Sequence, residues 1–193
     1  MEFKDFQDAV LDRFNAYLDE LCKKKTNSDK VEKLKKDNPD LKIPAPDYCK
    51  NTWDELKTQG LLPSLRATIP YSPRVDGIGR SVPNLTLKVP TGGGKTLLAT
   101  ASVSRIFGRY LSSNTGFVLW IVPNEAIYSQ TKKTLTNREH PYRQMLDRSS
   151  AGKVKILEKN DPLNREDVKS HLCVMLLMLQ SANRETKETL RLF

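Results

Sequence analysis

The chain has 193 residues, of which 38% are hydrophobic and 28% charged, a composition typical of a globular domain and not of a disordered, collagen-like or coiled-coil chain. Its net charge is +9, and residues 81–193 hold 17 basic and 9 acidic side chains against 15 and 14 in residues 1–80. The excess positive charge therefore lies in the second part. It would attract a polyanion such as nucleic acid, although a solvated basic surface without a partner is an equally open interpretation.

The sequence has no feature of a secreted or membrane-spanning chain. Its longest apolar run, residues 172–179, is much shorter than the roughly 20 residues that a helix needs to cross a bilayer, and the amino terminus begins with charged residues. The three cysteines are far apart and lack the spacing of a zinc site or a disulfide framework. We therefore expect free thiols and a cytoplasmic protein that does not contact a membrane.

Residues 1–80 are expected to form a small helical region that ends in a connector. Apolar side chains recur at spacings of three and four from Phe3 to Leu21, which predicts an amphipathic helix. Residues 23–50 are rich in lysine and contain three prolines, which predicts a short polar helix and then an extended connector. Thr52 has the spacing of a capping box with the glutamate that follows it, and Gly60 is placed to end the helix that this box would open.

From residue 81 onward, short apolar runs alternate with amphipathic segments, a pattern typical of a parallel sheet built from strand–helix–strand units. The predicted strands are residues 85–89, 117–122, 153–157 and 173–179, and the predicted helices are residues 96–111, 125–135 and 184–193. The last strand is apolar at every position, which indicates a strand covered on both faces, and Met175 and Met178 are expected to lie in the core. The fold class is thus predicted to be α/β, with a mainly parallel sheet in residues 81–193.

A glycine-rich turn, Pro90–Thr96, lies between the first predicted strand and the first helix of this part. It matches the phosphate-binding pattern G-x-x-x-x-G-K-[ST] at its last three positions, whereas Val89 occupies the place of the first glycine. Glycines allow successive amides to converge on phosphate oxygens, and the helix that follows presents its positive amino end to the same anion. A lysine in this place reaches the β- and γ-phosphates, and a threonine hydroxyl coordinates magnesium.

The turn therefore predicts a site for ATP and Mg²⁺. Its predicted cofactor-binding residues are Thr91, Gly92, Gly93, Gly94, Lys95 and Thr96. Of these, Lys95 and Thr96 are the predicted catalytic residues, and Thr96 is the predicted magnesium ligand. The alternative interpretation is a glycine turn that only closes a strand–helix unit beside an exposed lysine.

The same residues resemble a known family. Residues 89–96 resemble motif I of superfamily 2 helicases, in which the first glycine of the pattern is often replaced. Residues 84–135 closely resemble the motor (Res) subunit of type III restriction enzymes and related DEAD/DEAH-box helicase-like proteins, and residues 118–131 are similar to that family's second strand and motif Ia. The resemblance covers residues 81–193 and implies a first RecA-like P-loop NTPase domain that is incomplete at its carboxyl end.

The resemblance also implies an activity and partners. The family consists of ATP-dependent DNA helicases or translocases of restriction and related defence systems, so DNA is the implied partner, with a modification or specificity subunit as a further candidate. Its motif Ia contacts the nucleic-acid backbone, which agrees with the way a strand that ends in proline delivers backbone amides and a helix amino end to a polyanion. The predicted nucleic-acid-binding residues are Pro123, Asn124, Gln130, Lys132 and Lys133. Alternative interpretations are a helix cap for Asn124 and a solvent-facing side chain for Gln130.

Several elements of such a motor do not occur in the sequence. The acidic D-E-x-[HD] box that orients the attacking water is absent, and so are the later motifs that include the arginine finger. We therefore expect the chain to be the amino-terminal part of a longer protein and to hydrolyse ATP weakly or not at all. The glutamine nearest to motif I that could recognise adenine is Gln59, and the last strand with Gln180 and Ser181 has a weak likeness to the strand that precedes the acidic box. A regulatory nucleotide-binding module without motor activity and a kinase-type P-loop transferase remain as alternatives.

Overall fold

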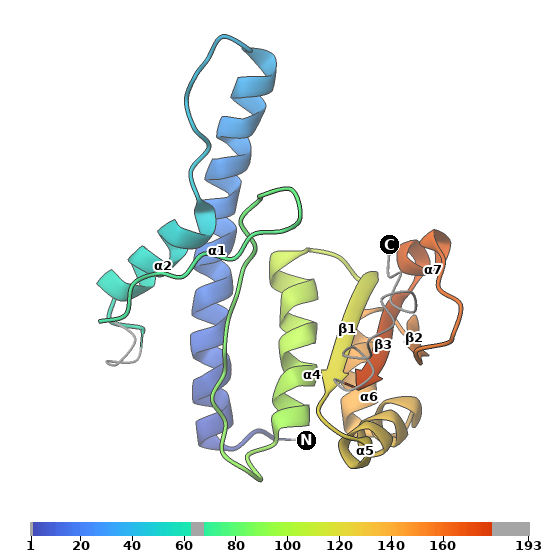
Figure 1. Cartoon of the computed structure of the whole chain (residues 1–193). Coiled ribbons are helices and arrows are strands. Elements are labelled where there is room, and N and C mark those ends of the chain that lie inside the picture. Colours follow the sequence, from blue (N-terminus) through green and yellow to red (C-terminus); the bar gives the residue numbers. More distant parts are fainter. Residues whose placement is uncertain (1, 63–67, 179–193) are drawn as a thin grey trace. The chain divides into compact units, whose positions relative to one another are not determined.

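The computed structural model describes residues 2–62 and 68–178, which divide into one compact unit at Glu2–Gly93 and a second that begins at Gly94 (Figure 1). The first unit contains the helices α1 (Asp5–Asp37) and α2 (Tyr48–Thr58). The second contains, in chain order, α4 (Lys95–Arg105), the π-helix η1 (Ile106–Tyr110), β1 (Gly116–Val122), α5 (Glu125–Thr136), α6 (Pro141–Ser149), β2 (Val154–Leu157), α7 (Arg165–Ser170) and β3 (Leu172–Met178). None of the helices in these ranges is both long enough and apolar enough to cross a bilayer.

The predicted amphipathic helix at the amino terminus is confirmed, but α1 is much longer than expected. It runs for 33 residues through the lysine-rich segment, so the prediction of a separate short polar helix is wrong. Ion pairs one turn apart support this continuation, since Lys24 contacts Glu20 at 3.2 Å and Lys25 contacts Asp29 at 2.6 Å. No proline interrupts the segment before Pro39, and the helix ends just ahead of that residue.

The helix α2 packs against α1, but it begins earlier than its predicted capping box. Asp47 is the N-cap, and its carboxylate accepts hydrogen bonds from the amides of Cys49 and Lys50 at 3.0 and 3.1 Å. Thr52 instead lies buried one turn into the helix and donates its hydroxyl to the carbonyl of Tyr48, so its predicted capping role is wrong. The predicted end is confirmed, because Gly60 follows α2 with a φ of +68°, a conformation that favours glycine.

The predicted strand at residues 85–89 does not form. This segment has no regular secondary structure, and Leu85 and Leu87 are 44% and 36% exposed. A strand requires a neighbour that exchanges backbone hydrogen bonds with it, and none of the strands within residues 68–178 pairs with this segment. Apolar character alone was therefore a misleading signal here.

The three other predicted strands form one parallel sheet in the order β1-β3-β2. The central strand β3 is buried on both faces, as its sequence predicted. Leu172, Val174 and Leu176 pack on one face with Phe107, Leu135 and Leu146, and Cys173, Met175 and Leu177 pack on the other face with Leu157. Met175 is in the core as expected, whereas Met178 is only partly buried. The predicted strand residue 179 and the predicted helix 184–193 lie outside the described residues, as do Gln180 and Ser181.

The α/β class with a mainly parallel sheet preceded by helices is therefore confirmed. The predicted helix at 96–111 begins as α4 and ends as the π-turn η1, and the helix predicted at 125–135 is α5. The sequence analysis missed α6 and α7, which are only 9 and 6 residues long, too short for an apolar repeat over several turns.

Candidate functional site

The glycine turn has a backbone that only glycine adopts without strain. Gly92 and Gly94 have φ angles of +76° and +77°. Gly93 has an ordinary φ but no room for a side chain, because an added Cβ would lie 2.7 Å from Cγ1 of Val89 and 3.0 Å from the carbonyl oxygen of Pro90. The amide of Gly93 donates to that same carbonyl at 3.1 Å and so closes a tight turn. Each of the three positions therefore favours glycine, Gly92 and Gly94 because of their positive φ angles and Gly93 because of the crowding around it.

The helix α4 begins directly after this turn, with Gly94 as its N-cap. The first amides of an α-helix have no intrahelical acceptor, and a glycine N-cap has no side chain that could accept from them. The helices α2, α5, α6 and α7 all begin with a residue whose side chain does accept: Asp47, Asn124, His140 and Asn164. The start of α4 therefore presents amides and the positive end of a helix dipole in the form that suits an anion.

Lys95 and Thr96 occupy the first two positions of α4. Lys95 is exposed and Thr96 is partly exposed, whereas the next two residues, Leu97 and Leu98, are buried. The Thr96 carbonyl accepts the hydroxyl of buried Thr100 at 2.8 Å. The polar side chains thus lie at the surface of a helix whose following residues fix it to the core.

Gln7 is a residue that the sequence analysis missed and that the structure brings to the glycine turn. Its side chain is only 5% exposed; Oε1 accepts the amide of Lys4 at 3.0 Å, and Nε2 donates to the carbonyl of Gly93 at 3.1 Å. The partners are 86 residues apart in sequence, so spacing gave no signal. Gln59, the glutamine singled out from the sequence, instead donates to Glu55 one turn earlier in α2, at 2.9 Å.

The predicted nucleic-acid contacts lie around the start of α5. Pro123 and Asn124 follow β1 and are exposed, as is Gln130. The side chain of Asn124 accepts the amide of Ile127 at 3.0 Å and caps α5, which is the role that its alternative interpretation gives it. Its contact with nucleic acid stays a prediction.

The two predicted lysines of α5 differ in their surroundings. Lys133 is exposed, whereas the ammonium of Lys132 forms an ion pair with Glu158 at 2.5 Å. The other carboxylate oxygen of Glu158 accepts the hydroxyl of Tyr128 at 2.9 Å. Lys132 and then Tyr128 hold the pKa of Glu158 below its ordinary value, while burial and the bond to Glu158 raise the pKa of Tyr128 to about 12.

The sheet brings these positions to one side of the second unit. Because β1, β3 and β2 are parallel, their carboxyl ends point to the same side of the sheet. Pro123 follows β1 on that side, and Glu158 follows β2, which ends three residues earlier in the register than β1. Figure 1 shows α4 running opposite to β1, so the amino end of α4 faces the same side as those carboxyl ends. In open α/β sheets, ligands bind on this side. Lys95 and Asn124 are therefore on the side of the sheet to which the carboxyl ends of its strands point.

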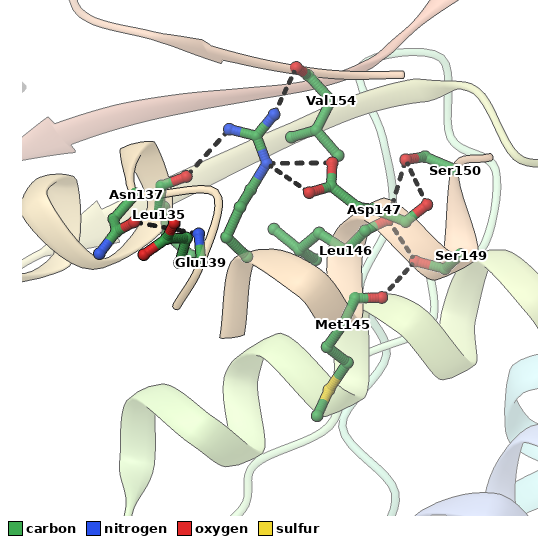
Figure 2. Close-up of polar contacts among 10 residues, drawn as sticks. Leu135, Asn137, Glu139, Met145, Leu146, Asp147, Ser149, Ser150 and Val154 are labelled. Carbon is green, nitrogen blue, oxygen red and sulfur yellow. Dashed lines mark hydrogen bonds and ion pairs between the residues drawn. The ribbon is translucent and has the colours of Figure 1, made fainter. Parts of the chain in front are cut away.

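A buried arginine links α5, α6 and the amino end of β2. Arg143 of α6 is 5% exposed; its Nε contacts both carboxylate oxygens of Asp147 at 3.1 Å, and its two terminal nitrogens donate to the carbonyls of Leu135 and Val154, each at 3.1 Å. Figure 2 shows these acceptors converging from the end of α5, from α6 and from the start of β2. This network is structural, and the sequence analysis missed it together with α6.

The residues of the turn fit a nucleotide phosphate better than a metal held by protein side chains alone. Within residues 2–62 and 68–178, no group of three histidine, cysteine or acidic side chains converges on a common point. The α4 amides and Lys95 are donors of the kind that phosphate requires, and the hydroxyl of Thr96, at the second position of α4, is the predicted magnesium ligand. A magnesium ion here would depend on phosphate oxygens and water for its other ligands.

A glycine turn that opens a helix on a parallel sheet defines the second unit as a RecA-like P-loop domain. Comparison with protein families agrees, because the model described as "Type III restriction enzyme, res subunit" matches residues 46–192. This match covers more than half of the chain, so the chain belongs to that family and carries its helicase-like ATP-binding module. No curated protein and no solved structure matches the chain.

Proposed function

We propose that this chain is the ATP- and DNA-binding part of an ATP-dependent helicase or translocase, the Res motor subunit of a type III restriction or related defence system. The observation that carries the proposal is the start of α4, where three sterically required glycines lead into a helix that no side chain caps. Membership of the restriction-enzyme family supports the choice of ATP, Mg²⁺ and DNA as ligands.

In this proposal each residue of the turn has one task. Thr91 and the glycines shape the backbone, and the amides of Gly94, Lys95 and Thr96 donate to phosphate oxygens. The ammonium of Lys95 neutralises phosphate charge, and the hydroxyl of Thr96 takes one position on Mg²⁺. Magnesium, when bound with the nucleotide, supplies charge neutralisation on the β- and γ-phosphate oxygens.

Nucleotide binding is tested by Lys95→Ala. Removing a charged donor from a phosphate costs about 1.5 to 3 kcal/mol, so the affinity for ATP with Mg²⁺ should fall about tenfold to a hundredfold. Isothermal titration calorimetry on the whole chain measures this, with Lys88→Ala as the control, because Lys88 is an exposed lysine just before the turn. Equal affinities for the wild type and Lys95→Ala would contradict the proposal.

DNA binding is tested by replacing Lys132 and Lys133 together with alanine. The wild type should bind DNA weakly and without sequence preference, with a log–log salt slope of about 2 to 4, because backbone contacts carry no base information. The double variant should show a flatter slope and unchanged nucleotide affinity. Fluorescence anisotropy at several salt concentrations measures the slope, and a slope that does not change would remove these lysines from the contact.

Hydrolysis distinguishes a motor from a regulatory module. Because the acidic box does not occur in this sequence, phosphate release by the chain alone should be negligible with or without DNA. Supplying the acidic box in a longer polypeptide should produce DNA-stimulated hydrolysis if the protein is a motor, and none if it is a regulatory nucleotide-binding module. Release of several phosphates per second by the chain alone would mean that its catalytic group has been misassigned.

A further inference from the structure

Glu158 forms four contacts within the second unit, two through its carboxylate and two through its backbone. Its two oxygens contact the Lys132 ammonium and the Tyr128 hydroxyl, which lie one turn apart on the same face of α5. Its backbone is fixed as well, because the Glu158 amide donates to the carboxylate of Asp161 at 2.8 Å and its carbonyl accepts the Asp161 amide at 3.1 Å. The turn after β2 therefore fixes the backbone of Glu158, and this limits where its carboxylate can lie when it pairs with Lys132.

This arrangement determines what Lys132 can offer to a ligand. Glu158 follows β2 directly, so the ion pair ties the Lys132 ammonium to the carboxyl end of β2, which lies three residues before the end of β1 in the register of the sheet. The pair is accessible, since the two side chains are 41% and 42% exposed. A phosphate that approaches Lys132 therefore meets an ammonium that already has a carboxylate partner.

We propose that Glu158 is an internal counter-ion that a nucleic-acid phosphate displaces from Lys132, so that Glu158 sets the affinity and salt dependence of DNA binding at α5. The inference rests on the proposed DNA-binding function. The carboxylate and a phosphate compete for one ammonium, and both cannot accept its charge fully. Glu158 thereby weakens the binding of a phosphate to Lys132.

The decisive variant is Glu158→Gln, which keeps the shape of the side chain and removes its charge. Exposed ion pairs are worth little, so the expected gain in DNA affinity is about twofold to fivefold. The log–log salt slope should become steeper by at most about 0.9, because Lys132 no longer shares its charge with a carboxylate and neutralises its phosphate fully. Tyr128→Phe removes the other partner of the carboxylate without changing any charge and should give a smaller gain.

The matched control is Glu166→Gln, which makes the same change in net charge in the same unit. Glu166 pairs with Lys169 on α7 at 2.9 Å and has no contact with Lys132. The Glu166→Gln variant should therefore have the same salt slope for DNA binding as the wild type. In the Lys132→Ala background, Glu158→Gln should have no greater effect than Glu166→Gln.

Anisotropy titration of the whole chain with a short labelled DNA, together with thermal melting of each variant, separates the outcomes. A gain for Glu158→Gln that needs Lys132 supports the proposal. No gain, a loss of affinity, or a gain that persists without Lys132 overturns it while leaving DNA binding by the wild type intact. Absence of DNA binding by every variant at low salt overturns the proposed DNA contact and this inference together.

Discussion

The helices α4 and α5 differ in the residue that caps their first turn, which is Gly94 in α4 and Asn124 in α5. Both helices begin on the side of the second unit to which the carboxyl ends of the strands point, and both begin with amides that lack an intrahelical acceptor. Asn124 satisfies an amide of α5 with its own side chain, whereas Gly94, the N-cap of α4, makes no such side-chain bond. The difference indicates that the start of α4 is better suited than the start of α5 to hold an anion by its backbone.

The two helices also differ in how their positions are fixed. The turn before α4 is shaped by crowding around Gly93 and by the bond from Gln7. The helix α5 is fixed at its start by Asn124 and near its end by Arg143, which donates to the carbonyl of Leu135. Four substitutions test this contrast, and they are ordered here from the largest expected effect to the smallest.

Arg143→Ala should cause the largest loss of stability. It leaves the carboxylate of Asp147 without its partner and the carbonyls of Leu135 and Val154 without donors, a type of change that costs about 3 to 5 kcal/mol. Urea-induced unfolding followed by circular dichroism measures the loss. Arg148→Ala, on the exposed side of the same helix, is the control and should change stability by less than about 0.5 kcal/mol. Equal midpoints for the two variants would show that the buried network contributes nothing.

Gly93→Ala should disturb the turn before α4 without touching α5. The new Cβ would overlap Cγ1 of Val89, and crowding of this kind costs about 1 to 3 kcal/mol. If the native turn is the nucleotide-binding form, ATP affinity should fall about fivefold to a hundredfold by calorimetry. Val89→Ala in the same chain should restore part of it, because it removes the atom nearest to the new Cβ. Unaltered affinity in the single variant would mean that the turn does not need this conformation.

Asn124→Ala tests the cap of α5. Loss of an N-cap side chain costs about 0.5 to 2 kcal/mol of stability, and the ATP affinity should not change. Asn124→Ser keeps a capping oxygen and should retain most of the stability. DNA binding then separates the two roles of this residue: a serine variant that is stable but binds DNA less tightly would show a direct contact by the asparagine side chain.

Gln7→Leu should have the smallest effect of the four and should act on nucleotide binding. The peptide between Gly93 and Gly94 is planar, so holding its carbonyl toward Gln7 directs its N–H the opposite way. Loss of one neutral hydrogen bond costs about 0.5 to 1.5 kcal/mol, which corresponds to about a twofold to tenfold loss of ATP affinity.

The matched control for Gln7→Leu is Ser28→Ala. Ser28 is also 5% exposed on α1 and also donates to a distant carbonyl, that of Pro46, at 2.8 Å. It should lower stability by a similar amount without weakening ATP binding. Equal losses of affinity in both variants would mean that the effect of Gln7 is only structural.

Local sequence patterns predicted the elements whose signal is contained in neighbouring residues. The uninterrupted apolar run at β3 predicted a strand buried on both faces, because such a strand needs apolar residues at every position. The glycine-lysine-threonine run predicted a turn opening a helix, because positive φ angles and close approach require glycine in a known order. The spacing of α1 predicted a helix but not its end, because ion pairs between its polar residues carry it beyond the apolar stripe.

What required the tertiary structure are the contacts between residues far apart in the chain. Segment 85–89 has the composition of a strand, but whether it pairs depends on a neighbour that its own sequence does not specify. The packing of the chain likewise decides three sets of contacts: the hydrogen bond from Gln7 to Gly93, the ion pair of Glu158 with Lys132, and the bonds from Arg143 to its three acceptor residues. The sequence determined the chemistry of the glycine turn, since backbone conformation there depends on adjacent residues. Only the tertiary structure showed that Gln7 forms a hydrogen bond with the turn and that Glu158 forms an ion pair with Lys132. Hydrogen bonds and ion pairs depend on distance in space, which the local sequence does not specify.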